Sequence, residues 1–238
     1  MTLTKIILND LQKYSNTEKQ RVSIKYFKTA KGEYGYGDQF WGVSVPDIRK
    51  VAKKYFTLIS LNQVKELIKS KIHEVRLLGY IILTYKYEKG DSRTKEEIFN
   101  FYIHNLYGAN NWDIVDLSCY KILGDYVLNN PEKRYLLYQL ADSKNMWEQR
   151  IAIVSTYALI KKNEFSDTLQ IAKILLNHEH DLIHKAVGWM LREVGKQDIE
   201  ELRMFLNANI KDINNTTLRY AIERMDNNER KYYLKSKK

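Results

Sequence analysis

The chain has 238 residues, and its two prolines, ten glycines and 44% hydrophobic content predict a helical protein large enough for a proper core. Lysine and arginine outnumber aspartate and glutamate by 39 to 29, and the resulting charge of +10 favours an anionic partner, nucleic acid first and a membrane surface second. The single cysteine, Cys119, excludes a disulfide framework and a cysteine-rich metal site, and it fits a reducing compartment.

No targeting signal is expected at the start of the sequence, because residues 1–9 lack a basic stretch followed by a long apolar core. The longest apolar run, near residues 77–83, is too short to cross a bilayer. We therefore expect a soluble, cytoplasmic protein that works in the bacterial cytosol or on the nucleoid.

Apolar residues at helical spacing predict helices over about residues 3–14 and 18–27. The pattern then breaks, and residues 31–42 hold four of the ten glycines and four aromatic residues. Glycine permits positive φ and tight reversals, so an insertion over residues 31–43 is predicted to be a loop or a short hairpin. Its aromatic side chains either wedge into a nucleic-acid groove or pin the loop to the protein.

From Pro46, which reads as the first turn of a helix, the chain is predicted to be helical nearly to its end. Five charged residues each precede an apolar helical face at spacings of 37, 37, 35 and 34 residues, namely Arg76, Asp113, Arg150, Lys185 and Arg219. Units of this size are helix pairs that must stack on their neighbours. We therefore predict an all-α, HEAT-like helical repeat solenoid, forming a single domain over residues 1–238 with a concave basic face.

Four of these five positions are basic. If equivalent helices line the concave side, Arg76, Arg150, Lys185 and Arg219 form a cationic track that binds phosphates. The second repeat is the exception, because it carries Asp113. The basic tail, residues 230–238, is expected to fray in solvent and to add nonspecific phosphate attraction.

The stretch 185–196 combines two different surfaces at one helical period. Lys185, Trp189, Arg192 and Lys196 fall at i, i+4, i+7 and i+11 and share one side, while the opposite side is apolar. Three cations around a tryptophan suit a polyanion that contains an electron-poor group. A solvated helix with one packed tryptophan explains the same pattern equally well.

The stretch 111–116 carries the candidate chemistry. Trp112 and Asp116 are four residues apart and hence on one face of a helix, while Asp113 lies nearer the helix start and is interpreted as structural. A carboxylate among cations stays ionised and can stabilise the oxocarbenium-like state through which deoxyribose loses a base. A salt bridge from Asp116 to a neighbouring helix is the alternative.

At these residues the chain resembles the DNA alkylation repair (AlkD-like) alkylpurine glycosylases. The resemblance extends over about residues 20–235 and is carried by five stretches, namely 32–46, 111–116, 147–152, 185–193 and 218–224. It implies a HEAT-like repeat fold that removes cationic N3- and N7-alkylpurines from duplex DNA without drawing the base into a pocket. It also implies that neither a metal nor another cofactor is needed.

Carried over by motif, the resemblance makes Asp116 the catalytic carboxylate, Trp112 and Trp189 the aromatic pair against the deoxyribose, and Arg150 the clamp on a phosphate. The chemistry agrees, because an alkylated purine is already a cationic leaving group that needs no general acid. We expect Lys185, Arg192, Arg76 and Arg219 to bind phosphates as well, and Tyr26 to meet the DNA.

Two other functions stay open at this point. The insertion at residues 31–43 looks longer than in well-known glycosylases, so the chain is alternatively a non-catalytic module that binds damaged or branched DNA. A protein-binding scaffold is the third reading and predicts no affinity for DNA. The histidines at 178, 180 and 184 lack a further ligand at suitable spacing, so no metal site is expected. We expect a monomer whose partner is duplex DNA containing alkylated purines.

Overall fold

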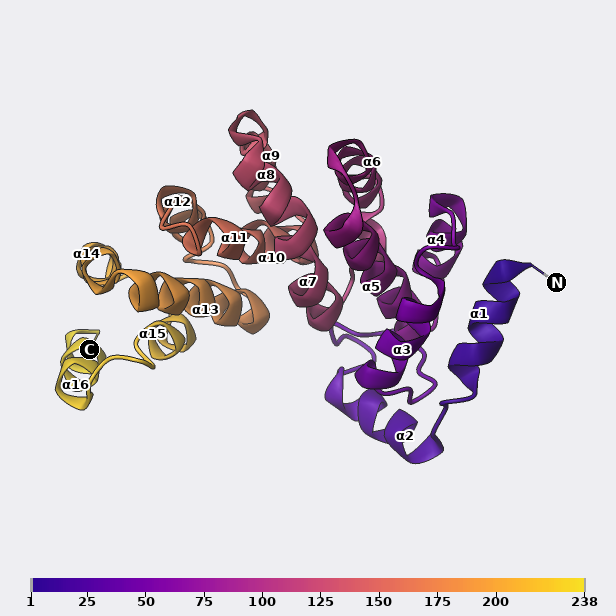
Figure 1. Cartoon of the computed structure of the whole chain (residues 1–238). Coiled ribbons are helices and arrows are strands. Elements are labelled where there is room, and N and C mark those ends of the chain that lie inside the picture. Colours follow the sequence, from indigo (N-terminus) through magenta and orange to yellow (C-terminus); the bar gives the residue numbers. More distant parts are fainter. Residues whose placement is uncertain (1, 238) are drawn as a thin grey trace. The chain divides into compact units, whose positions relative to one another are not determined.

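The computed structural model describes residues 2–237, and the regular elements among these residues are helices (Figure 1). Within them, the only β-type pairing is an isolated bridge between Gln39 and Ile72. The prediction of an all-α, repeat-like fold is therefore confirmed. The chain packs as two compact units, which meet in sequence between Ser118 and Cys119 at the end of a helix. The two units are described one after the other, and the assignment of a single domain stays a prediction.

The first unit is organised around α5, a helix of 17 residues that is buried along most of its length. Its neighbours within the unit are α3, α4 and α6, and this explains why its sequence is apolar on nearly every side. The elements of this unit are α1 (Leu3–Gln12), α2 (Thr17–Tyr26), α3 (Val45–Tyr55), α4 (Leu61–Ile68), α5 (His73–Lys89), α6 (Ser92–Ile103), η1 (Leu106–Gly108) and α7 (Trp112–Cys119).

The second unit continues the pairing of helices, with α10 packed on α9 and α13, and α13 packed on α14 and α15. Its elements are η2 (Tyr120–Gly124), α8 (Asp125–Asn129), η3 (Pro131–Lys133), α9 (Tyr135–Ala141), α10 (Met146–Ser155), α11 (Tyr157–Ile160), α12 (Ser166–Ile174), α13 (Asp181–Gln197), α14 (Ile199–Asn209), α15 (Asn215–Ala221) and α16 (Asn227–Ser236). The segment η2 is a π-helical turn that follows α7 directly.

The five charged positions that marked the sequence repeat all fall within the first five residues of a helix. They lie on α5, α7, α10, α13 and α15 in that order. In the second unit, α13 contacts both α10 and α15, so helices that carry equivalent positions are also neighbours there. Gly188 makes one of these contacts close, because a Cβ at this position would lie 2.6 Å from the carbonyl oxygen of Thr217.

The end of the chain differs from the prediction of a fraying tail. Asp226 caps α16 by accepting hydrogen bonds from the amides of Asn228 and Glu229, and Tyr233 is only 3% exposed. A capped helix with a buried tyrosine is held in place, so the expectation that the tail frays is wrong for this helix. Lys238 lies outside the described residues. Among residues 2–237, no helix has both the length and the apolar character needed to cross a membrane.

Candidate active site

The Gly-rich loop between α2 and α3 is fastened to the first turn of α5. Three successive loop amides, those of Trp41, Gly42 and Val43, donate to the carboxylate of Glu74 at 2.7 to 3.2 Å. Glu74 is 3% exposed, so these charge-assisted bonds are shielded from water. Gly42 has φ +74°, and a Cβ there would lie 2.1 Å from the carbonyl oxygen of Asn16. The segment is thus a packed loop rather than a hairpin.

The aromatic residues of this loop divide between the two roles that its sequence suggested. Phe40 is 2% exposed and pins the loop to the protein, with its ring stacked 5.3 Å from that of Phe27. Tyr36, in contrast, is 65% exposed at the tip of the loop. Of these two residues, only the exposed Tyr36 is available to a partner.

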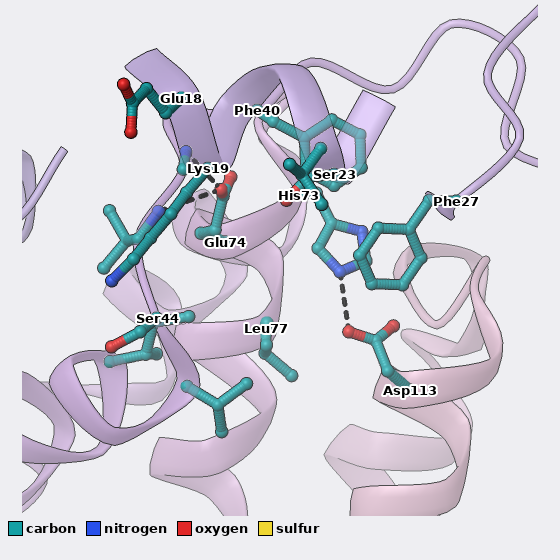
Figure 2. A pocket seen from close by; sticks show the side chains of 15 residues that line it. Glu18, Lys19, Ser23, Phe27, Phe40, Ser44, His73, Glu74, Leu77 and Asp113 are labelled. Atoms are coloured by element: carbon teal, nitrogen blue, oxygen red, sulfur yellow. Dashed lines mark hydrogen bonds and ion pairs between the residues drawn. The ribbon is translucent and has the colours of Figure 1, made fainter. Parts of the chain in front are cut away.

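A cavity of about 440 Å³ lies beside the loop (Figure 2). Its walls are largely apolar, and three ionisable side chains from α5 and α7 also reach it. The apolar lining includes Val22, Phe27, Phe40, Val43, Ile48 and Leu77, and the ionisable side chains from these two helices are His73, Glu74 and Asp113. His73 and Glu74 are almost fully buried, so their charges are weakly screened by solvent.

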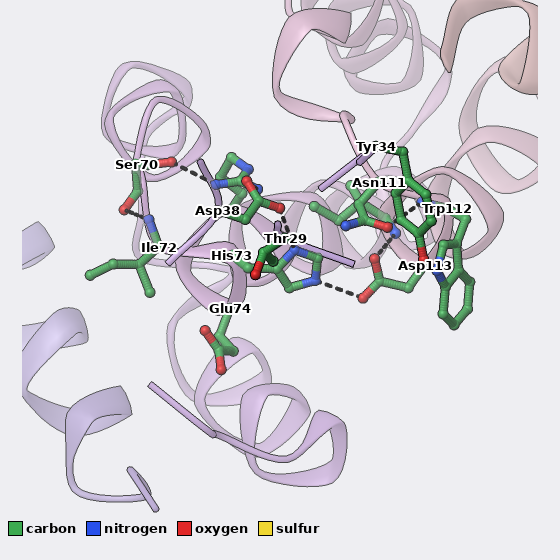
Figure 3. A network of polar contacts seen from close by, with 12 residues as sticks. Thr29, Tyr34, Asp38, Ser70, Ile72, His73, Glu74, Asn111, Trp112 and Asp113 are labelled. Carbon is green, nitrogen blue, oxygen red and sulfur yellow. Dashed lines mark hydrogen bonds and ion pairs between the residues drawn. The ribbon is translucent and has the colours of Figure 1, made fainter. Parts of the chain in front are cut away.

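A buried network of charges joins the loop, α5 and α7 (Figure 3). His73 Nε2 lies 2.8 Å from Asp113 Oδ2, and His73 Nδ1 lies 3.4 Å from Asp38 Oδ2. Arg76 Nη2 donates to the other oxygen of Asp38 at 2.6 Å. Burial raises the pKa of Asp38, but the hydrogen bond from His73 and the charge of Arg76 outweigh it and lower the pKa. Asp38 is therefore ionised at neutral pH.

Arg76 occupies a different place from the one its sequence register predicted. The residue is 4% exposed, its charge is paired with Asp38, and its Nη1 donates to the carbonyl oxygen of Ser70 at 3.0 Å. A guanidinium that is buried and already paired cannot meet a phosphate without breaking these bonds. In this structure Arg76 holds the loop, and its assignment as a phosphate ligand stays a prediction.

The first turn of α7 presents the candidate catalytic residues. Asn111, which is fully buried, accepts a hydrogen bond from the amide of Trp112 at 2.9 Å, and Asp113 accepts one from the amide of Ile114 at 2.9 Å. Asp113 is thus structural, as its position near the helix start indicated. Trp112 and Asp116 are both half-buried and lie one turn apart on the same face of α7, while Ile114 is buried on the other side.

Trp112 is embedded in a cluster of rings. The ring of Tyr26 meets it edge-on at 5.8 Å, and the ring of Phe27 stacks on it at 5.6 Å. Phe27 also lies 4.7 Å from the imidazole of His73. Tyr26 is 62% exposed, so the first unit brings an exposed tyrosine next to the half-buried Trp112. The proximity of Tyr26 to the motif at residues 111–116 was not visible in the sequence.

In the second unit, α13 has the two faces that its sequence predicted. Val187, Met190 and Leu191 are buried on one side, while Trp189 on the other side is half-buried, with its ring 6.2 Å from that of Tyr157. This face is therefore partly open at the indole.

The cations of the second unit are engaged to different degrees. Lys185 forms an ion pair with Asp181 at 2.7 Å, and Arg192 pairs with Glu223 on the segment after α15. Arg219 is exposed. Arg150 is only 5% exposed and donates from Nη1 to the carbonyl oxygen of Leu182 in α13, so its assignment as a phosphate clamp stays a prediction.

The three histidines near the start of α13 bind their own chain. His178 Nε2 lies 2.8 Å from Gln149 Oε1, His184 Nε2 contacts the carbonyl oxygen of His178, and His180 accepts from the amide of Leu182. Over residues 2–237, no group of three or more metal-binding side chains is arranged to hold a metal ion. These histidines therefore organise the turn that leads into α13.

The structure thus assembles two groups of candidate residues, one in each unit. Tyr26, Trp112 and Asp116 lie together in the first unit, and Lys185, Trp189 and Arg192 share one face of α13 in the second. Sequence patterns missed His73, Asp38 and Phe27, which support the first group. The only local hint was that His73 precedes a repeat position by three residues, close to the start of a helix.

Comparison with known proteins shows the family and the fold of this chain. The family model described as "DNA alkylation repair enzyme" matches residues 7–225. The fold is similar to that of a "Predicted DNA alkylation repair enzyme from Enterococcus faecalis", with a TM-score of 0.70 and 16% identity over 90% of this chain and 97% of that chain. It is also similar to smu.31 from Streptococcus mutans, with a TM-score of 0.54 and 17% identity over 94% of this chain and 100% of that one.

At these identities the two solved structures show a shared fold, while the family match covers most of the sequence. No curated protein matches the chain. The residues that the family model matches include both groups of candidate site residues. The chain therefore belongs to the DNA alkylation repair enzyme family.

Proposed function

We propose that this chain is a monofunctional DNA glycosylase that hydrolyses the N-glycosidic bond of cationic N3- and N7-alkylpurines in duplex DNA. The observation that carries the proposal is the face of α7, where the half-buried Asp116 lies one turn from the indole of Trp112, beside the exposed Tyr26. Membership of the DNA alkylation repair enzyme family supports alkylated DNA as the class of substrate.

Each residue of this face has a defined role in the proposed reaction. Departure of an alkylated purine leaves positive charge on the deoxyribose, and the Asp116 carboxylate stabilises that charge and orients the attacking water. Trp112 and Trp189 are each assigned to stabilisation of the sugar cation, since aromatic faces attract cations. The purine departs as a neutral base, so no general acid is required. If Asp116 supplies about 4 kcal/mol, its loss slows the reaction about a thousandfold.

We further propose that the second unit binds the duplex through its phosphates, which contact Arg150, Lys185, Arg192 and Arg219. Two of these cations now pair with exposed acids, since Asp181 is 54% exposed and Glu223 is 49% exposed at the side chain. Surface ion pairs contribute little, so a phosphate can replace the acid of Lys185 at small cost, whereas Arg192 also lies 3.6 Å from the buried Glu193.

The test is release of 3-methyladenine and 7-methylguanine from a methylated duplex by the purified protein and by its Asp116→Asn variant. We expect the intact protein to release alkylated bases and the variant to bind DNA equally well while release falls about a thousandfold. If Asp116→Asn releases bases at the original rate, the catalytic assignment of Asp116 is wrong.

A second candidate function, binding of damaged or branched DNA without base release, is supported by the 65% exposed Tyr36 at the loop tip. Deleting the whole loop would also remove Asp38 and the amides that hold Glu74, so a point substitution is the better test. Tyr36→Ala leaves those bonds in place. If the protein never releases a base and this substitution abolishes binding to a branched duplex, the second function replaces the first.

A further inference from the structure

The first turn of α5 is the point at which the loop and α7 are joined. His73 is 1% exposed, and its two ring nitrogens face carboxylates from different segments, Asp38 in the loop and Asp113 in α7. Arg76 also reaches Asp38, and Tyr34 of the loop forms a side-chain hydrogen bond with Trp112 of α7. His73 is thus one of the side chains that connect a packed loop to the short helix that carries the candidate site, and it does so through two carboxylates.

We propose that His73 is a positioning residue of the active site, which holds the first turn of α7 through Asp113 and so fixes the orientation of Trp112 and Asp116. This inference rests on the proposed function only for its effect on base release. The position of Trp112 is a separate, directly measurable consequence.

The geometry explains why α7 needs this support. The helix has only eight residues, and short helices are marginally stable without tertiary contacts. Asp113 uses one carboxylate oxygen for the amide of Ile114 and the other for His73, so the same side chain caps the helix and fastens it to α5. Asp116 follows Asp113 by three residues, less than one helical turn. A small rotation of the first turn therefore moves Asp116 directly.

A second contact passes through aromatic rings. Phe27 lies between the imidazole of His73, at 4.7 Å, and the indole of Trp112, at 5.6 Å. The ring of Phe40 stacks on the imidazole of His73 at 4.9 Å and on the ring of Phe27 at 5.3 Å. The imidazole is consequently part of the support for Trp112 as well as of the ionic network.

The charge of His73 determines how many bonds it donates. The ionisable groups that face it are Asp38 from the loop, Asp113 from α7 and Arg76 from its own helix. Burial lowers the pKa of His73, but the two carboxylates more than compensate and raise it to about 9. Below that pH the imidazolium donates to both acids, whereas the neutral ring has a single N–H and releases one of them.

The first experiment compares His73→Leu with His73→Gln, whose amide nitrogen can still donate to Asp113. A control variant, His184→Gln, alters another buried histidine, which lies in the second unit. Single-turnover release of 7-methylguanine and DNA affinity are measured for each protein from pH 6 to 9.5, after subtraction of spontaneous depurination. Unfolding curves for each variant establish that the proteins compared are folded.

We expect His73→Leu to slow release about 10- to 100-fold with DNA affinity changed less than about threefold, since a shift of about 1 Å in a reacting group has this size of effect. In the original protein, release should decline as the pH rises through about 9, where His73 loses its charge. His73→Gln should recover release to within about threefold of the original protein and should not show this decline. Equal release by folded His73→Leu, or a folded His73→Gln as impaired as His73→Leu, would overturn the proposal.

The second experiment uses no DNA. Two-dimensional NMR follows the imidazole of His73 and the indole N–H of Trp112 through a pH titration, with Trp112→Phe identifying the indole signal. We expect the Trp112 signal to move with the same midpoint as His73, near pH 9, and the His73 midpoint to fall in Asp113→Asn. An indole signal that does not follow His73 overturns the positioning role. Coupled signals in a protein that releases no base would reject the glycosylase while leaving the positioning of Trp112 intact.

Discussion

Nε2 of His73 lies 2.8 Å from Oδ2 of Asp113, and this bond joins residues 40 positions apart in the sequence. It connects the first turn of α5, which is buried along most of its length, to the first turn of α7. Trp112 begins α7, and Asp116 follows one turn later. The candidate catalytic face is therefore built on the core of that unit rather than on a mobile segment, and this favours a fixed geometry around Asp116.

The pH dependence of stability follows from the charge of His73. Its pKa is raised from 6.5 to about 9 in the folded protein, so the stabilisation is complete below pH 6.5 and is lost as the pH rises through about 9. The full effect is at most about 3 kcal/mol. We expect urea denaturation to show a falling free energy of unfolding between pH 7 and 9.5. In His73→Leu this slope should disappear; if the slope persists there, another group causes it.

Gly42 should be intolerant of any side chain. In Gly42→Ala the new Cβ would meet the carbonyl oxygen of Asn16 at 2.1 Å in a backbone with φ +74°. We expect a loss of about 2 to 4 kcal/mol in the free energy of unfolding, measured by urea denaturation.

Gly37→Ala is the matched control, because Gly37 has φ +90° but nothing within 4 Å of its Cβ position. It should cost only about 1 to 2 kcal/mol, from the backbone conformation alone. Equal losses for the two variants would show that the contact with Asn16 contributes nothing.

Phosphate contacts on α13 should appear in the salt dependence of DNA binding. Arg192→Gln and Lys185→Gln should each lower the slope of log K against log salt concentration by about one, measured by fluorescence anisotropy on a duplex. Arg203→Gln is the control, because Arg203 lies on α14 and is held by Glu200 and Glu229. A slope that changes equally in the control variant would mean that overall charge, and not α13, determines binding.

Trp189 should contribute less to the reaction than Asp116. An aromatic face next to a cation contributes about 0.5 to 2 kcal/mol, so Trp189→Ala should slow base release about 2- to 30-fold, against about a thousandfold for Asp116→Asn. Trp189→Phe keeps an aromatic face and should retain most of the rate. Single-turnover release on methylated duplex measures both variants, and full activity of Trp189→Ala would remove this indole from the mechanism.

Much of the fold could be predicted because its signals are local. The two faces of α13 follow from side chains spaced at 3.6 residues per turn, and the pairing of Trp112 with Asp116 follows from a separation of four residues. The repeat spacing likewise predicted equivalent helical positions for Arg150, Lys185 and Arg219, and the structure has each of them as the fifth residue of its helix.

The support of the site could not be predicted in the same way. Asp38, His73 and Asp113 are separated by 35 and 40 residues, so no sequence period links them. Arg76 shares the repeat position of the other cations, yet it is buried and forms an ion pair with Asp38 of the loop. Only tertiary packing decides whether a cation at such a position meets solvent, and one sequence does not contain that information in a local form.

The hydrogen bonds from the loop to Glu74 determine how the loop responds to a substitution of that residue. One carboxylate satisfies three adjacent amides, so an uncharged, non-accepting replacement would strand all three donors simultaneously in a water-poor setting. A substitution of Glu74 would therefore not weaken the attachment of this segment gradually. All three hydrogen bonds would be lost together, and the stacking of Phe40 on the ring of Phe27 would be weakened with them.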